Sequence, residues 1–173
     1  GDRENADLQK KKLPAFTPSG TFEGGRAVDK LLRYSQFIIL DLDKLSDQQL
    51  SEAFDKASAE PYTFCCFRSP SGQGLKILIE VDSEQEHHSE AFAQVATYYE
   101  EALQLKLDRS GKDIPRLCFF SSDPECYRNL NHKKFHVELP GTEAEEPAVP
   151  PQPTPVNHQE QPEEVNTSFE NCI

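Results

Sequence analysis

The most distinctive pattern in the chain is an apolar run that ends in two carboxylates. Residues 37–40 are all apolar and include two isoleucines, and Asp41, Leu42 and Asp43 follow directly. An apolar run of this kind predicts a strand that is covered on both faces. Because alternate side chains of a strand point the same way, we expect Asp41 and Asp43 to share one face while Leu42 points into the core.

Two amphipathic helices are predicted after this strand. Ser46 with Gln49 three residues later is the pattern of a capping box. The apolar residues that follow recur at the spacing of a helix packed on a sheet, namely Leu50, Ala53, Phe54 and Ala57. A second long helix begins at Ser83 or Ser89, and its apolar stripe includes Phe92, Val95, Ala96, Tyr99 and Leu103.

Strands account for most of the remaining apolar positions. Residues 62–67 and 75–81 predict two strands joined by a short glycine-containing loop, which is the pattern of a hairpin. Other short elements are predicted as an edge strand or extended arm at 13–22, a helix at 26–34, and strands at 105–108, 114–120 and 134–139. The mixed order predicts the α+β class, with a central, mostly antiparallel sheet and two principal helices on one face.

Charge and proline content divide the chain into three parts. Residues 141–173 contain seven Glu, six Pro and neither Lys nor Arg, so they can bury too little apolar surface to offset the entropy of ordering. We expect a flexible segment at 1–12, one domain at 13–140, and an acidic, proline-rich linker or tail at 141–173. The whole chain has a net charge of −12 and the part before the tail −5. Nucleic-acid binding would therefore require basic residues to gather in one place. The candidates are residues 10–12 and a second set of Arg109, Lys112, Arg116, Arg128, Lys133 and Lys134.

The remaining composition argues against a membrane protein and against a zinc domain. No apolar run approaches the roughly 18 residues of a membrane span, and no signal-peptide pattern opens the chain. The five cysteines have neither CxxC nor metal-finger spacing, which indicates reduced thiols in a cytoplasmic protein. Cys65 and Cys66 would face opposite sides of a strand. Four histidines are expected at the surface or in turns rather than as ligands, namely His87, His88, His132 and His136.

Three polar clusters lie at the ends of predicted strands, and each has two explanations. Asp41 and Asp43 either hold a divalent cation, whose preferred ligands are carboxylate oxygens, or cap the turn after their strand. Asp108 ends a predicted strand and either joins them or forms a turn. Arg116 on the next strand either steadies a bound anion or makes an ion pair with Asp108 or Asp113.

The third cluster is the segment 69–76, Ser-Pro-Ser-Gly-Gln-Gly-Leu-Lys. Its glycines, Gly72 and Gly74, either serve a tight hairpin or offer backbone N–H groups to a phosphate chain. Lys76 either is solvated or supplies an ammonium group to the same phosphates. Together with the carboxylates, this segment is suited to nucleotidyl transfer by two metal ions, one activating the attacking hydroxyl and one stabilising the leaving pyrophosphate.

The order DxD, then SxxGxGLK, then an aspartate followed by an arginine strand resembles the archaeo-eukaryotic primase and primase-polymerase superfamily. More closely, residues 13–17, 39–43, 69–76 and 116–124 resemble the VirE N-terminal-type domain, a primase-like module usually encoded on bacterial mobile elements. The resemblance covers about residues 13–139 and none of the tail. It implies an RRM-like catalytic core that often precedes a helicase or second replication domain.

Carried over by position, the resemblance implies catalytic and metal-binding roles for three aspartates, namely Asp41, Asp43 and Asp108. The nucleotide-binding positions are Ser71, Gly72, Gly74, Lys76 and Arg116. The second motif usually ends in histidine, and here that position is Lys76. The expected ligands are Mg²⁺ or Mn²⁺, a nucleoside triphosphate and a nucleic acid, with a DNA template favoured.

Two other classes of function remain open. One is a catalytically inactive nucleic-acid-binding or protein-docking module with the same fold. The other is a DxD-dependent glycosyltransferase, which would need a sugar-nucleotide site that no other segment supplies.

Overall fold

The computed structural model describes residues 12–139. The predicted flexible segment, apart from Lys12, and the predicted tail at 141–173 lie outside these residues. Within them, no helix combines the length and the apolar character that crossing a membrane requires.

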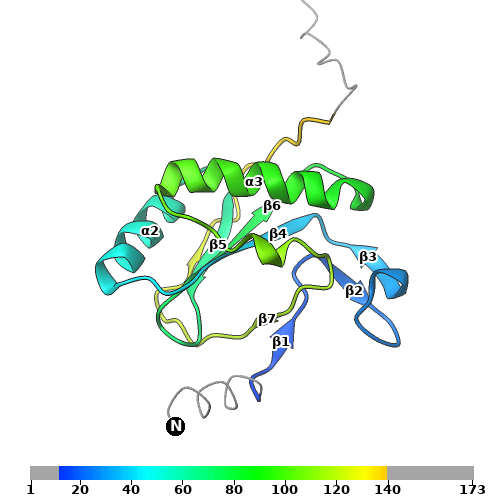
Figure 1. Ribbon diagram of the computed structural model, residues 1–173, viewed down its shortest axis with the longest axis horizontal. Helices are drawn as coiled ribbons and strands as arrows, with labels where there is room; N and C mark the ends of the chain where they lie inside the picture. The colour runs from blue at the N-terminus through cyan, green and yellow to red at the C-terminus, as the bar shows by residue number, and fades with distance from the viewer. Residues whose placement is uncertain (1–11, 140–173) are drawn as a thin grey trace, which may run out of the picture. The chain divides into compact units, whose positions relative to one another are not determined.

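A four-stranded antiparallel sheet forms the centre of the fold (Figure 1). Its strand order is β4-β6-β5-β8, and the bounds are β4 Phe37–Leu42, β5 Thr63–Arg68, β6 Leu75–Glu80 and β8 Tyr127–Arg128. The predicted hairpin is therefore confirmed as β5 and β6, and the carboxylate-ending strand as β4. The register places Asp41 of β4 opposite Lys76 of β6, which in turn lies opposite Phe67 of β5.

Two helices cover one face of this sheet, α2 (Asp47–Ala59) and α3 (His88–Leu103) (Figure 1). The capping box is present, since the Ser46 hydroxyl accepts the Gln49 N–H at 3.3 Å and the Gln49 side chain accepts the Ser46 N–H at 3.0 Å. The helices bury alternate residues of the strands, among them Ile38, Leu40, Leu42, Leu75, Ile77 and Ile79, together with Ala53, Val95, Ala96 and Tyr99.

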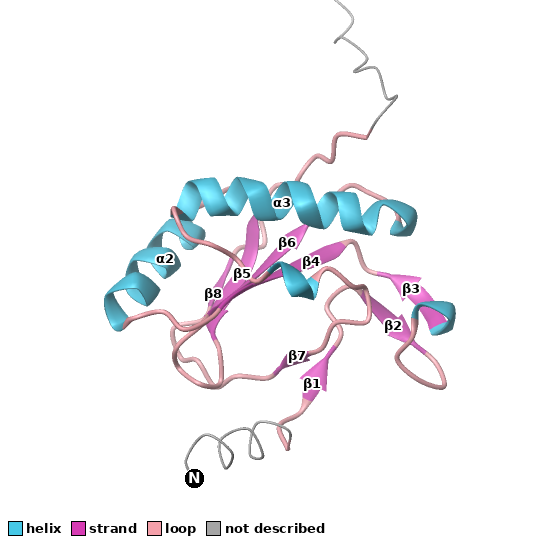
Figure 2. Ribbon diagram, viewed as in Figure 1, coloured by secondary structure: helices cyan, strands magenta, loops and turns pink. Residues whose placement is uncertain are grey.

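The opposite face carries a much smaller apolar cluster. It consists of Ile39, Phe67, Leu78 and Cys118, with Phe16, Phe37, Phe64 and Cys65 packed against it. Cys118 belongs to β7 (Cys118–Phe119), which pairs with β1 (Ala15–Phe16) as a separate two-stranded sheet (Figure 2). A third small sheet joins β2 (Gly20–Phe22) to β3 (Leu31–Tyr34). The α+β class with two principal helices is thus confirmed.

The prediction of a helix at 26–34 is wrong. Only Val28–Lys30 makes one 3₁₀ turn, labelled η1, and β3 follows at once. Pairing of β3 with β2, in which Gly20 lies opposite Tyr34, overrides the helical spacing of the apolar residues.

The three short strands predicted near the end of the domain are also corrected. Residues 105–108 contain no strand and lead into the 3₁₀ turn η3, Arg109–Gly111. Of 114–120 only β7 is a strand, because Pro115 has no N–H to donate and the N–H of Arg116 closes a turn on the carbonyl of Asp113. In 134–139 only Phe135 bridges, to Val81 after β6. A 3₁₀ turn, η2 (Gln85–His87), precedes α3, and β8 was not predicted.

Candidate functional site

Asp41 and Lys76 occupy the polar end of the sheet face that no helix covers. Asp41 follows Ile39 on this face of β4, and Lys76 precedes Leu78 on the same face of β6. Because they are register partners, their side chains meet directly.

The two side chains form a largely buried ion pair. The ammonium Nζ of Lys76 contacts Oδ2 of Asp41, and the exposed fractions of the two side chains are 9% and 14%. Burying charges costs desolvation energy, and only a close opposite charge offsets it. Lys76 is therefore not the solvated strand lysine that one explanation allowed.

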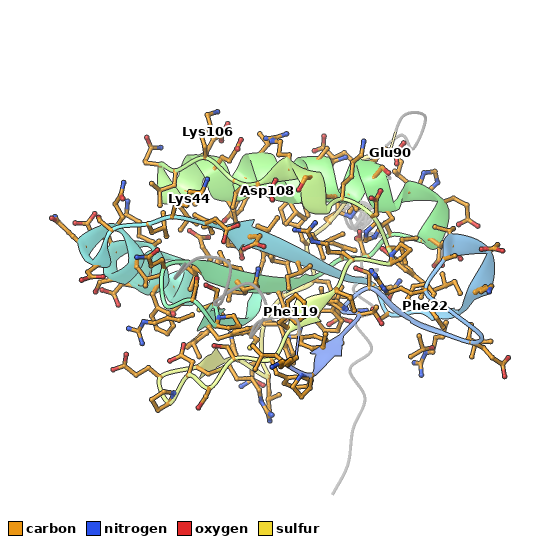
Figure 3. The ribbon with its side chains drawn as sticks, turned by 60° about the horizontal axis from the view of Figure 1, so that its bottom comes forward. Phe22, Lys44, Glu90, Lys106, Asp108 and Phe119 are labelled. Carbon is orange, nitrogen blue, oxygen red and sulfur yellow. The ribbon has the colours of Figure 1, made fainter. Side chains whose placement is uncertain are left out.

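Asp108 is brought to the same place by a main-chain hydrogen bond. Its N–H donates to the carbonyl of Asp41 at 3.0 Å, so the segment after α3 lies along the free edge of β4. Figure 3 shows Asp108 beside that strand, toward the same end of the molecule as Lys44. The Asp108 carboxylate accepts the N–H and the hydroxyl of Ser110 at 2.9 and 2.8 Å, and these bonds lower the pKa of Asp108 despite partial burial.

Arg116 links the two aspartates. Its Nη2 lies 3.8 Å from Oδ2 of Asp41 and 3.8 Å from Oδ2 of Asp108. An ion pair with Asp108 or Asp113 was one of two explanations for Arg116, and the structure has the pair with Asp108 and a second one with Asp41. Four residues from four separate segments converge here, two carboxylates with two cations, and we call this set the Asp41–Asp108 cluster: Asp41, Lys76, Asp108 and Arg116.

Asp43 lies beyond the last residue of β4 and is exposed. Its Oδ1 borders Gly74, since a Cβ added to that glycine would lie 3.1 Å from it. In the part of the chain that the structure describes, no three or more His, Cys, Asp or Glu side chains form a group that could hold a metal ion.

The carboxylate oxygens of Asp41 and Asp108 are nevertheless of the kind that binds a hard divalent cation. Oδ1 of Asp41 is buried and has no hydrogen-bond partner among residues 12–139, whereas Oδ2 contacts both cations. A buried carboxylate oxygen without a donor costs free energy, and Mg²⁺ or Mn²⁺ prefers such oxygens. A bound cation would find part of its coordination shell in these two carboxylates.

The glycine loop has structural reasons for both of its glycines. Gly72 has a φ of +73°, and its N–H closes a turn on the carbonyl of Ser69 at 2.9 Å. A Cβ on Gly74 would lie 2.5 Å from the carbonyl oxygen of Leu42, so the loop packs against the end of β4. Ser71 is exposed, and its hydroxyl lies 3.0 Å from that of Ser69. The hairpin explanation accounts for these contacts.

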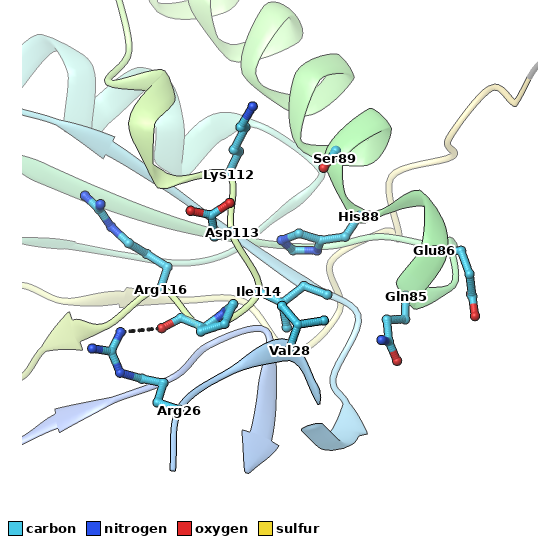
Figure 4. A pocket seen from close by; sticks show the side chains of 11 residues that line it. Arg26, Val28, Gln85, Glu86, His88, Ser89, Lys112, Asp113, Ile114 and Arg116 are labelled. Carbon is cyan, nitrogen blue, oxygen red and sulfur yellow. Dashed lines mark hydrogen bonds between the residues drawn. The ribbon is translucent and has the colours of Figure 1, made fainter. Parts of the chain in front are cut away.

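A pocket of about 600 Å³ opens next to the cluster, and Arg116 lines it. Figure 4 shows the guanidinium groups of Arg26 and Arg116 on one side of the pocket and Gln85 with Glu86 on the other. Arg26 donates to the carbonyl of Pro115 at 2.6 Å, which fixes one wall. The sequence contains no signal for Arg26 at this position, because 89 residues separate it from its partner.

His88 lines the same pocket and corrects an expectation. It was predicted at the surface or in a turn, but only 4% of it is exposed and its Nδ1 lies 2.8 Å from the Tyr34 hydroxyl. Burial lowers the pKa of His88 to about 4, with a small opposing effect from Asp113. The ring is therefore neutral near pH 7.

Residues 8–127 match the family of the BT4734-like N-terminal domain, and the match covers more than half of the chain. The chain therefore belongs to this family. No curated protein and no solved structure matches it.

Proposed function

We propose that the domain at 13–140 is a primase-polymerase-like nucleotidyltransferase that acts in DNA replication of a mobile element. The observation that carries this proposal is the Asp41–Asp108 cluster: two carboxylates, distant in sequence, held side by side with a lysine and an arginine at the end of the sheet face without helices. Phosphoryl-transfer sites combine these groups, because anionic oxygens bind metal ions and cations bind phosphate.

Each residue of the cluster has a role in this proposal. Asp41 and Asp108, with Asp43 at the rim, would hold Mg²⁺ or Mn²⁺, which activates a hydroxyl nucleophile and stabilises the leaving pyrophosphate. Lys76 and Arg116 would bind the triphosphate, Lys76 as a compact charge and Arg116 through its planar fork of donors. Until the nucleotide binds, ion pairs with Asp41 and Asp108 hold the side chains of Lys76 and Arg116 in place.

The adjoining pocket gives the rest of a nucleotide a place to bind. Besides Arg116, its lining includes the basic residues Arg26 and Lys112 and the apolar residues Val28, Ile114 and Pro115. Basic groups suit phosphates, and apolar surfaces suit a base or sugar.

The sequence resemblance and the family match support the proposal by covering nearly the same stretch, about 13–139 for the VirE N-terminal-type domain and 8–127 for the BT4734-like N-terminal domain. By that resemblance the template is DNA, and a helicase or second replication domain accompanies this domain in the same protein. The cysteine spacing supports the cytoplasm as the compartment.

A second candidate is an inactive module with the same fold that binds nucleic acid or docks a protein. The contact between the Lys76 ammonium and the Asp41 carboxylate favours it, because that ammonium stands where a metal ion would be needed. The absence of a group of three metal-ligating side chains among the described residues points the same way.

Primer synthesis and primer extension with Mg²⁺ or Mn²⁺ separate the two candidates. We expect the wild-type chain to incorporate nucleotides and the Asp41→Asn/Asp43→Asn double variant to be inert. A charge-matched control, Asp29→Asn/Asp55→Asn, changes two exposed carboxylates outside the cluster and should retain activity. A wild-type chain as inert as the first double variant would overturn the enzymatic proposal.

Nucleotide binding is measured in parallel. Mn²⁺ with a nucleoside triphosphate should raise the melting temperature of the wild type by mass action, and Asp41→Ala should abolish that rise. A rise in an inactive wild-type chain would favour a binding module.

A further inference from the structure

Two thiols lie in contact at the outer edge of the main sheet. Cys65 belongs to β5, and Cys126 directly precedes β8, the edge strand that pairs with β5. Their sulfur atoms are 3.7 Å apart although 61 positions separate them in the sequence.

Both thiols are accessible, in contrast to the neighbouring cysteine. Cys126 is exposed and Cys65 is half-buried. Cys66 is fully buried on the helix-covered face, with its sulfur 3.4 Å from the Ser58 hydroxyl. The expected alternation of Cys65 and Cys66 is therefore confirmed, and Cys66 serves as a built-in control.

Several bonds hold the two sulfurs together independently of their own contact. The N–H of Arg68 donates to Oδ2 of Asp123 at 2.7 Å, and its guanidinium contacts Glu125. The N–H of Cys126 closes a turn on the carbonyl of Asp123 at 3.2 Å. These bonds fix the segment that precedes Cys126, and the pairing of β8 with β5 fixes the segment that follows it.

We propose that Cys65 and Cys126 are a redox pair that forms a reversible disulfide by exchange with low-molecular-weight disulfides. Both thiols are expected to be reduced in a reducing compartment. The Cys65–Cys126 disulfide forms when low-molecular-weight disulfides accumulate there. This proposal is independent of the proposed function.

The exchange has two steps. The Cys126 thiol loses its proton, and the thiolate attacks one sulfur of the small disulfide RSSR, giving a mixed disulfide and RS⁻. The Cys65 thiol then loses its proton and attacks the Cys126 sulfur, which expels a second RS⁻. The two released protons end on the two RS⁻ groups, so two protein thiols are oxidised while RSSR is reduced to two RSH.

Exposure sets the order of these steps. Burial, followed by hydrogen bonding to Cys126, raises the pKa of Cys65 to about 12, so little Cys65 thiolate exists near neutral pH. Cys126 is therefore the first nucleophile. The bond would close a long loop and tie the edge strand to the sheet, which favours the folded state.

The test treats the full chain with oxidised glutathione, blocks the remaining thiols by alkylation, and maps peptides by mass spectrometry. We expect a Cys65–Cys126 bond, a shift of the urea midpoint to higher concentration, and reversal of both by a reducing agent. Cys66→Ala should leave the bond unchanged, whereas Cys126→Ser and Cys65→Ser should each abolish it.

Cys126→Ser keeps the test decisive even if Cys65→Ser unfolds, because Cys126 is exposed and its replacement should leave the urea midpoint of the reduced chain unchanged. Stable mixed disulfides on Cys126 without closure would overturn the proposal. So would a bond that joins Cys126 to Cys66 or to Cys172.

Discussion

The two faces of the main sheet are built on different principles. The helix-covered face is an apolar core in which side chains from β4, β5, β6, α2 and α3 interdigitate. The opposite face has an apolar patch of four buried residues and ends in the Asp41–Asp108 cluster. The same strands therefore supply a hydrophobic core on one side and a buried polar cluster on the other.

The contrast shows where the chain bears a free-energy cost. Burial of apolar side chains contributes about 25 cal/mol per Å² to folding. A buried ion pair, in contrast, is often no more stabilising than apolar residues of the same volume. Packing alone therefore accounts for the first face and not for the second, and this difference is the physical support for placing the proposed function at the second face.

The largest effects are expected from truncations that compare the two faces directly. Ile77→Ala removes three carbon atoms from a side chain that is 0% exposed under the helices, and we expect it to lower the free energy of unfolding by about 4 kcal/mol. Leu78→Ala removes the same number from the other face, where Leu78 is 8% exposed, and should cost about 2 kcal/mol. Urea unfolding of both variants measures the difference. Equal losses would contradict the contrast between the faces.

The helix-covered face could be predicted from the sequence because its signals are local. The capping box at Ser46, the two apolar stripes and the hairpin each depend on residues a few positions apart. The structure confirms them with small shifts at the ends, such as a second helix that begins at His88 rather than at Ser83 or Ser89.

The cluster could be predicted only in part, because its residues meet through register and tertiary contact. The order of the motifs indicated Asp41 and Lys76 as candidates, but their ion pair depends on the register of β4 and β6. Arg116 was expected on a strand and instead follows a turn, which aims it at both aspartates. Arg26 and His88 came to the pocket from segments whose pairing no local pattern encodes.

A second prediction tests whether the cluster is coupled. Lys76→Met keeps the aliphatic stem but leaves the buried Asp41 carboxylate with only Arg116, 3.8 Å away. We expect a loss of about 3 kcal/mol in the free energy of unfolding, because an uncompensated buried charge remains. Asp41→Asn in the same chain should recover part of this loss by removing that charge.

A double-mutant cycle of these two substitutions measures the coupling from urea unfolding at neutral pH. Additive losses would mean that the two side chains do not interact in solution. If Lys76→Met left the free energy of unfolding unchanged, the explanation of Lys76 as a solvated strand residue would be restored.

A third prediction concerns the neutral histidine at the start of α3. The folded pKa of His88 is about 4, and the unfolded value is about 6.5. Between these values the unfolded chain binds a proton that the folded chain does not, so the unfolding free energy falls as the pH falls, by about 3 kcal/mol in all. His88→Asn should flatten the slope between pH 6.5 and pH 4, measured by urea unfolding at several pH values.

His136 provides the control with the opposite sign. It is exposed, and its hydrogen bond to Asp82 raises the pKa of His136, so its contribution is present at low pH and is lost as the pH rises. His136→Asn should therefore leave the fall of the unfolding free energy between pH 6.5 and pH 4 as it is in the wild type. If the unfolding free energy of His88→Asn fell with pH as steeply as that of the wild type, the His88 ring would be protonated or exposed in solution.

The smallest expected effect separates stability from binding. Ser46→Ala removes the acceptor for the Gln49 N–H at the start of α2, and should lower the free energy of unfolding by about 1 kcal/mol. Because α2 lies on the helix-covered face, the affinity for a nucleoside triphosphate with Mn²⁺, measured by calorimetry well below the melting temperature, should not change. Asp108→Asn should do the reverse, weakening nucleotide binding while its partly exposed side chain contributes little to folding. If Ser46→Ala weakened nucleotide binding as much as Asp108→Asn, the two faces of the sheet would not be separable in function.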